Sequence, residues 1–82
     1  MKEFKIKVEV KLKSVVLDPQ GKTVLTALKN LGYNQVIDTR IGKLIELKLI
    51  ESSKDIAKEK VKEMCTKLLS NPIIEDYSIT VE

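Results

Sequence analysis

The chain has 82 residues, of which 43% are hydrophobic and 33% charged, and its formal net charge is +3 at pH 7. These values fit one small globular domain rather than a disordered segment, and no apolar run approaches the roughly 20 residues of a membrane span. The sequence has no histidine, the commonest general acid or base, and its single cysteine cannot form an internal disulfide. The first ten residues alternate in charge and lack a signal-peptide core, so we expect a cytoplasmic protein.

Residues 4–13 alternate strictly between apolar and charged side chains. The apolar set lies at even positions from Phe4 to Leu12, and the charged set lies at odd positions from Lys5 to Lys13. A period of two predicts a strand with one buried and one solvated face. Residues 14–17 are expected to form the loop that follows it.

The next segment carries the signals of a helix start and a helix end. Asp18 occupies the N-cap position and Pro19 the first helical turn, where its missing N–H costs nothing. Apolar residues then recur at spacings of three and four, and Gly32 follows in the usual left-handed C-terminal position. The pattern predicts a helix over residues 19–31.

The middle of the chain favours two further strands. Residues 36–41 and 44–51 are rich in β-branched and aliphatic side chains, and Gly42-Lys43 lies between them. We expect this pair to form the tight reversal of a hairpin, with Gly42 supplying a positive φ.

The last third of the chain predicts a second helix and a final strand. Ser52 followed by Asp55 fits a capping box, and Asn71-Pro72 ends the helix. The helix carries an apolar stripe made of Ile56, Ala57, Val61, Met64, Cys65, Leu68 and Leu69. Apolar residues alternate again from Tyr77 to Val81, which is typical of a strand.

The predicted order is β-α-β-β-α-β within one domain, residues 1–82. This order favours an α+β, ferredoxin-like fold in which two helices cover one face of a four-stranded antiparallel sheet. A chain of this size buries only a little over 60% of its unfolded surface, and pairing with a second copy is a common remedy. We therefore expect a homodimer formed through the sheet.

The segment from Gln20 to Lys22 could be a phosphate cradle at a helix start. A Walker-type loop needs GxxxxGK[ST], and the sequence DPQGKT has only the last three residues of that pattern. A phosphate can still lie at many helix N-termini. The pattern favours an ordinary capped helix over a nucleotide-binding loop.

Three other features could carry chemistry, and each has a simpler structural interpretation. Arg40, Gly42 and Lys43 make either a solvated turn or a docking point for an anion or a protein. Cys65 lies on the apolar stripe of the second helix, which favours core packing over a nucleophile. The lysines of residues 5–13 favour a solvated strand face over an RNA-binding sheet, which would carry paired aromatics.

Three segments together closely resemble one family. VLDPQGKTVLTALKNLG (residues 16–32), TRIGKLIEL (residues 39–47) and MCTKLLSNPIIEDYSITVE (residues 64–82) are similar to the PurS family, the small subunit of phosphoribosylformylglycinamidine (FGAM) synthase. The likeness covers nearly the whole chain in order. LDPQG, the R-x-GK turn and the MC-x-KLL-x-NP-x-IEDY block are far more specific together than any one of them alone.

The resemblance implies an assembly subunit with no catalytic, cofactor-binding or metal-binding residues of its own. A dimer or tetramer of such a chain would join a large synthetase subunit (PurL) to a glutaminase subunit (PurQ) and help to pass ammonia between them. ATP and magnesium are then expected on the large subunit. The complex would make FGAM in the fourth step of de novo purine biosynthesis, with no role for nucleic acid or membrane.

The family likeness also directs two hypotheses about surfaces. We expect one set of residues to dock on the larger subunits: Asp18, Pro19, Gln20, Gly21, Lys22, Arg40, Gly42 and Lys43. Gly21 costs up to about 1 kcal/mol in a helix relative to alanine, so a close backbone approach by a partner would explain it. Asn71, Pro72 and Tyr77 are expected to shape the fold or the homodimer.

Two alternatives from other classes stay open at this point. A free-standing regulatory module of ferredoxin-like architecture would bind an amino acid or a nucleotide at a dimer interface. An RNA-binding protein is disfavoured by the presence of only three aromatic residues.

Overall fold

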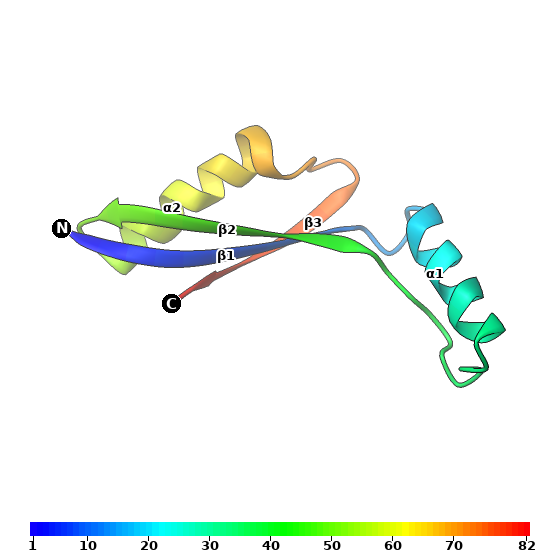
Figure 1. Ribbon diagram of the computed structural model, residues 1–82. Coiled ribbons are helices and arrows are strands. Elements are labelled where there is room, and N and C mark those ends of the chain that lie inside the picture. The colour runs from blue at the N-terminus through cyan, green and yellow to red at the C-terminus, as the bar shows by residue number, and fades with distance from the viewer.

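The computed structural model describes residues 1–82, and Figure 1 shows an elongated α+β chain. The elements in chain order are β1 (Lys2–Leu12), α1 (Pro19–Asn30), β2 (Gly42–Glu51), α2 (Lys54–Met64), the π-helical turn η1 (Cys65–Leu69) and β3 (Glu75–Val81). No helix combines the length and the apolar character needed to cross a membrane.

The sheet has three antiparallel strands in the order β2-β1-β3. The predicted α+β class and the antiparallel pairing are therefore confirmed. The central strand β1 pairs with both neighbours, so that Ile6 lies opposite Leu47 on one side and opposite Val81 on the other. The predicted alternation of β1 is also confirmed, because Ile6, Val8 and Val10 are buried while the residues between them are exposed.

Helix α2 covers the apolar face of the sheet and supplies the other half of the core. Ala57, Val61 and Cys65 complete the core cluster begun by the three buried residues of β1, and the predicted core position of Cys65 is confirmed. The helix begins one residue later than the predicted capping box, because the Ser53 hydroxyl, not that of Ser52, accepts the cap hydrogen bond.

The end of the second helix widens into the π-helical turn η1. The widened turn rotates Leu68 out of the apolar stripe and leaves it exposed, although Cys65, one turn earlier, is fully buried. Of the predicted stripe, Ala57, Val61 and Cys65 are buried and Met64 and Leu69 pack against the core, whereas Ile56 and Leu68 are exposed. Ser70 then adopts an extended conformation, and the chain turns at Asn71-Pro72 into β3.

The predicted strand over residues 36–41 is wrong, and so is the hairpin at Gly42-Lys43. These residues form an extended connection that pairs with no strand, and Gly42 opens β2 opposite Lys11. The carboxylate of Asp38 accepts a hydrogen bond from the backbone amide of Thr39, and the carboxylate of Asp18 accepts one from the amide of Ile41. These two amides are therefore not hydrogen-bonded to a neighbouring strand. Gly42 has no positive φ; a Cβ there would meet the carbonyl oxygen of Val10 at 2.6 Å.

Helix α1 does not cover the sheet, which corrects the expectation of two helices on one face. It lies beyond one end of the strands, and the connection from residue 31 to residue 41 runs back beside it (Figure 1). We call this part, residues 18–41, the arm. Because residues 36–41 do not form a strand, the chain between α1 and β2 does not run back across the sheet. Helix α1 therefore lies beyond the end of the sheet, beside the connection that follows it.

The bounds of α1 are close to those predicted. The helix ends at Asn30, and Gly32 has a φ of 100°, the left-handed conformation expected of it. The arm makes the molecule long, with extents of 51 × 25 × 14 Å. The radius of gyration is 16.3 Å, whereas a compact domain of this length has a value of about 12 Å.

Candidate partner-docking site

The base of the arm is built around the carboxylate of Asp18. Its backbone is extended, with φ −116° and ψ 90°, and its Oδ1 accepts a hydrogen bond from the amide of Gly21 at 3.0 Å. This contact satisfies one of the free amides of the first turn of α1. The predicted N-cap is therefore confirmed.

The second oxygen of Asp18 ties the helix to the strand that leaves the arm. Oδ2 accepts from the amide of Ile41 at 2.7 Å, across 23 positions of sequence. Asp18 is only 5% exposed. One carboxylate thus holds both connections between the arm and the sheet.

The pKa of Asp18 is lowered from its ordinary value by these contacts. The hydrogen bond from Ile41 has the largest effect, the bond from Gly21 follows, and the charge of Arg40 acts in the same direction, while partial burial opposes them. All three favourable contacts stabilise the ionised carboxylate.

Gly21 permits the close approach of the two connections. A Cβ at this position would collide with the carbonyl oxygen of Thr39 and with the Asp18 carboxylate. The close backbone approach proposed for Gly21 is thus present within the chain itself. Contact of Gly21 with a partner subunit stays a prediction.

Arg40 fastens the loop that leads into the arm. Its guanidinium donates to the carbonyl oxygens of Leu12 at 3.2 Å, Lys13 at 2.9 Å and Val16 at 3.3 Å. With the Asp18 contacts, these bonds join residues 12–21 to residues 39–41. We call the group Asp18, Gly21, Thr39, Arg40 and Ile41 the arm clamp.

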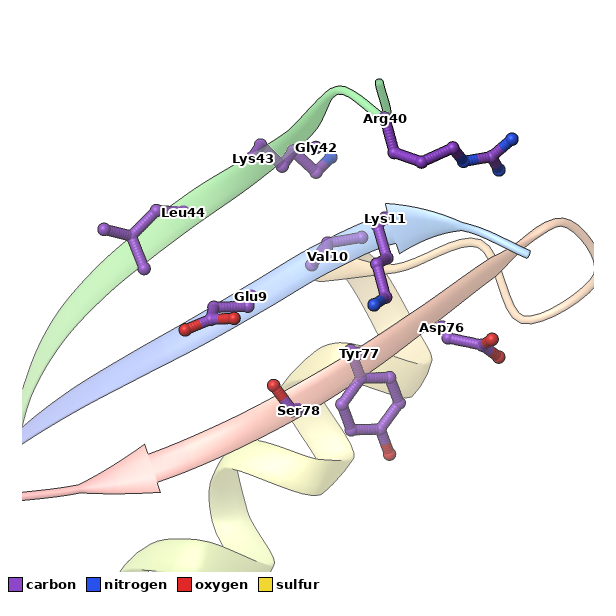
Figure 2. Close-up of a pocket in the computed structure, with 10 residues that line it drawn as sticks. All are labelled: Glu9, Val10, Lys11, Arg40, Gly42, Lys43, Leu44, Asp76, Tyr77 and Ser78. Carbon is purple, nitrogen blue, oxygen red and sulfur yellow. The ribbon is translucent and has the colours of Figure 1, made fainter. Parts of the chain in front are cut away.

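The remaining candidate docking residues lie around the clamp. Pro19 and Gln20 line an open hollow on the first turn of α1, and Lys22 is exposed on the same turn. Gly42 and Lys43 open β2 and border a second hollow of about 400 Å³ at the same end of the sheet (Figure 2). The sequence-based set is therefore brought together in space, part of it in the clamp and part on the surface beside it.

The second hollow has a mixed charge. Figure 2 shows Lys11 on β1, Asp76 on β3 and Arg40 just before β2, all at one end of the sheet. Asp76 is paired with Lys13 at 2.8 Å, whereas Lys11 and Lys43 form no ion pair. This part of the surface therefore offers two free ammonium groups.

The residues expected to shape the fold or the homodimer lie at the turn before β3. The Asn71 carbonyl accepts from the amides of Ile74 and Glu75, and the amide of Asn71 donates to the Glu75 side chain at 2.7 Å. Pro72 occupies this turn, and Tyr77 lies opposite Val10 on β3 at the border of the second hollow. Contact of these residues with a second copy stays a prediction.

Two members of the clamp were missed by the sequence. Thr39 contributes a carbonyl oxygen and Ile41 an amide, and both positions look like ordinary variation beside Arg40. Backbone groups are present at every residue, so no sequence signal could have identified them.

Apart from the clamp, burial raises the pKa of the Cys65 thiol, and no group of three or more metal-ligating side chains is present.

We predict that the clamp weakens in acid. Because the folded pKa of Asp18 lies below the unfolded value, its contribution is complete above the unfolded pKa and is lost as pH falls through the folded pKa. Amide hydrogen exchange at Gly21 and Ile41 should therefore speed up as the pH falls below about 4, beyond the intrinsic pH effect.

Substitution of Asp18 tests whether its carboxylate causes this loss of protection in acid. Asp18→Asn keeps one carbonyl oxygen but presents an NH₂ group to the other amide, so protection should be lower at neutral pH and should lose its acid step. Asp55→Asn, on the exposed first turn of α2, is the matched control and should leave the step unchanged. An acid step that survives in Asp18→Asn would contradict the assignment.

The fold and the clamp together define a class: a small α+β chain with one helix on a three-stranded sheet and a second helix on a fastened arm. The family model described as PurS, phosphoribosylformylglycinamidine (FGAM) synthase, matches residues 5–82. The PurS subunit of phosphoribosylformylglycinamidine synthase from Bacillus subtilis is 53% identical over 79 residues, which is 96% of this chain and 93% of the relative. The chain belongs to the PurS family.

Solved structures agree with this assignment over the full length. A chain in the structure of PurLQS from Thermotoga maritima superimposes with a TM-score of 0.93 and 35% identity, covering 100% of both chains. PurS from Methanocaldococcus jannaschii, described as a subunit of formylglycinamide ribonucleotide amidotransferase, gives a TM-score of 0.87 and 46% identity, covering 96% of this chain and 95% of the other. The extended arm lies within the aligned region of both.

Proposed function

We propose that this chain is the PurS subunit of FGAM synthase, an ATP- and glutamine-dependent ligase of purine biosynthesis. It joins a PurL-type synthetase subunit to a PurQ-type glutaminase subunit and contributes no catalytic residue. The observation that carries the proposal is the full-length match to a chain of the PurLQS structure, arm included.

The shape of the chain supports a bridging role. The molecule is 51 Å long, and the clamp fixes α1 at one end of the sheet while α2 covers the other part of it. An element held outside the core is available to contact a second protein. The exposed first turn of α1 and the start of β2 are the surfaces we assign to the larger subunits.

The finer parts of the proposal concern assembly and cofactors. The subunit works in the cytoplasm as a homodimer or a tetramer, and it supports the transfer of ammonia from PurQ to PurL. ATP and magnesium bind to the large subunit and not to this chain. The few buried residues of the isolated chain, 9 of 82, support a partner that covers more of it.

We predict that glutamine-dependent turnover requires this chain. Purified PurL-type and PurQ-type subunits should form FGAM from glutamine only when the chain is added, whereas ammonia as donor should support turnover without it. A ternary complex should elute from a sizing column in the same mixture. Unchanged glutamine-dependent turnover without the chain, and no ternary complex, would overturn the proposal and favour a free-standing ligand-binding module.

A further inference from the structure

Two segments without charged residues lie side by side at the end of the sheet nearer the arm (Figure 1). Of all residues in the chain 33% are charged, yet residues 14–17 (SVVL) and 68–74 (LLSNPII) contain no charged side chain. The amide of Lys13 donates to the carbonyl oxygen of Ile74 at 2.8 Å, and the ammonium group of Lys13 pairs with Asp76 at 2.8 Å. These contacts join the loop that leads into the arm to the turn before β3.

Both segments expose large aliphatic side chains. Val15 and Leu17 of the loop are 89% and 62% exposed, and Leu68 and Ile73 of the turn are 83% and 82% exposed. We call these four residues the aliphatic patch. Single apolar residues are common on protein surfaces, whereas a group of them on neighbouring charge-free segments marks a place where another molecule binds.

The turn is held in place by its own hydrogen bonds. The π-helical turn η1 rotates Leu68 away from the core, and the amide of Ser70 closes it on the carbonyl oxygen of Cys65 at 3.0 Å. The side-chain oxygen of Asn71 accepts from the amide of Ile73 at 3.1 Å. Widened turns of this kind are frequent at functional sites. A segment that is fixed before binding also loses less conformational entropy when it binds.

The loop is fixed as well. Arg40 donates to the carbonyl oxygens of Lys13 at 2.9 Å and Val16 at 3.3 Å, and the amide of Val16 donates to the carbonyl oxygen of Lys13 at 2.9 Å. The loop that carries half of the aliphatic patch is therefore fastened by a member of the arm clamp. The patch is continuous with the surface that we assign to the larger subunits.

We propose that the aliphatic patch inserts into an uncharged apolar hollow of a larger subunit, the same subunit that contacts the base of the arm. The inference rests on the proposed bridging function and assigns a further surface to it. The core of a protein–protein interface is depleted of charged residues and its rim is polar. The two charge-free segments have the composition of such a core, and the exposed Lys22 and Lys43 at the base of the arm then belong to the rim.

The hollows of the chain itself do not receive this patch. Of five hollows on its surface, four are lined by charged residues. The fifth, on the first turn of α1, belongs to the surface already assigned to the larger subunits. Another copy of this chain therefore offers no free uncharged hollow, which favours a different protein as the partner.

Truncation of one patch residue tests the contact. The chain is titrated into fixed amounts of the PurL-type and PurQ-type subunits, and glutamine-dependent turnover is measured. In Ile73→Ala, the concentration of chain that gives half-maximal turnover should rise at least about tenfold, because most of an isoleucine side chain is no longer buried in the complex.

Ile50→Ala is the matched control. Ile50 is 66% exposed on the face of the sheet that α2 does not cover, and it lies opposite Glu3 at the end away from the arm. The same truncation there should leave the half-maximal concentration unchanged. Ile50 and Ile73 both lie outside the core, so neither substitution should change the midpoint of chemical denaturation. A loss of stability would then not explain the weaker assembly of Ile73→Ala.

Loosening the turn separates the position of the patch from its apolar area. Asn71→Ala removes the oxygen that accepts from the amide of Ile73 but keeps all four aliphatic side chains. The half-maximal concentration should rise, because the turn must then be ordered during binding. Asn71→Ser restores an oxygen that can accept the same hydrogen bond, and it should recover part of the affinity.

A photo-crosslink identifies the partner. Ile73→benzoylphenylalanine should crosslink to one of the two larger subunits in the assembled complex, as read by mass spectrometry. Lys43→benzoylphenylalanine, at the start of β2, should crosslink to that same subunit. Ile50→benzoylphenylalanine should crosslink to neither of them.

The outcomes separate this inference from the proposed function. An Ile73→Ala variant that assembles as tightly as the wild type, or a crosslink from residue 73 to a second copy of the chain, would overturn the inference. Crosslinks from residues 73 and 43 to different subunits would overturn it too, because the two surfaces would not be shared. The bridging function stands in each case, provided that glutamine-dependent turnover still requires the chain. If turnover does not require the chain, both the proposed function and this inference fail.

Discussion

Ile6→Ala is expected to lower the free energy of unfolding by about 3 kcal/mol, within the 2–5 kcal/mol typical of buried isoleucine truncation. Ile6 is 1% exposed and belongs to a core of six buried residues, shared between β1, α2 and the start of η1. Because the chain has so few buried residues, little of the surrounding structure can close the cavity. A domain of this length has roughly 4–12 kcal/mol of total stability, so the variant should lose between about a quarter and about three quarters of it.

Chemical denaturation at one fixed protein concentration measures this effect, because association with a second copy would add to the stability of both proteins. Ile37→Ala is the matched control, since Ile37 is 90% exposed on the arm. It should change the free energy of unfolding by less than about 0.5 kcal/mol. Equal losses for the two variants would show that the core described for the isolated chain does not dominate its stability.

The elements set by local chemistry were predictable from the sequence. The alternation of β1 and the caps of α1 depend on residues within a few positions of one another, and both are present as expected. The sequence predicts the capping box of the second helix one residue early, because Ser52 and Ser53 are equally good caps by residue type. The structure selects Ser53, whose hydroxyl reaches the amide of Ile56 at 3.2 Å.

The arrangement of the middle segment was not predictable from the sequence. Residues 36–41 have strand-like composition, but the carboxylates of Asp18 and Asp38 take the amides of Ile41 and Thr39. The Asp38 contact is local and competes with strand formation, whereas the Asp18 contact spans 23 positions and depends on how the chain folds. The result is a three-stranded sheet with an open edge, in place of the four-stranded sheet that the composition favours.

The candidate site was predictable in part. The sequence points to the segment Asp18–Lys22 and the positions around Arg40 for possible contact with other proteins, and the structure brings both to the base of the arm. The sequence does not indicate that three of these residues, Asp18, Gly21 and Arg40, make contacts within their own chain. Arg40 donates only to backbone carbonyls, and such acceptors have no signature in the sequence.

The opposing effects of a methyl group at position 21 lead to the last prediction. Gly21→Ala should stabilise α1 by up to about 1 kcal/mol on helix propensity alone. In the folded chain, however, the new Cβ meets the Thr39 carbonyl and the Asp18 carboxylate. Neither can rotate away without breaking the clamp, and overpacking of this kind costs about 1–3 kcal/mol. We therefore expect Gly21→Ala to disrupt the hydrogen bonds of the clamp.

The measurement is amide hydrogen exchange resolved along the chain. In Gly21→Ala the amides of α1 and Ile41 should lose protection, while those of β1 should change little, because the arm lies outside the core. Gln20→Ala, on the same turn and exposed, adds no contact and should preserve protection. Stronger protection in Gly21→Ala would mean that helix propensity dominates and that the approach of Thr39 is dispensable. If the arm also positions the larger subunits, glutamine-dependent turnover should fall in Gly21→Ala.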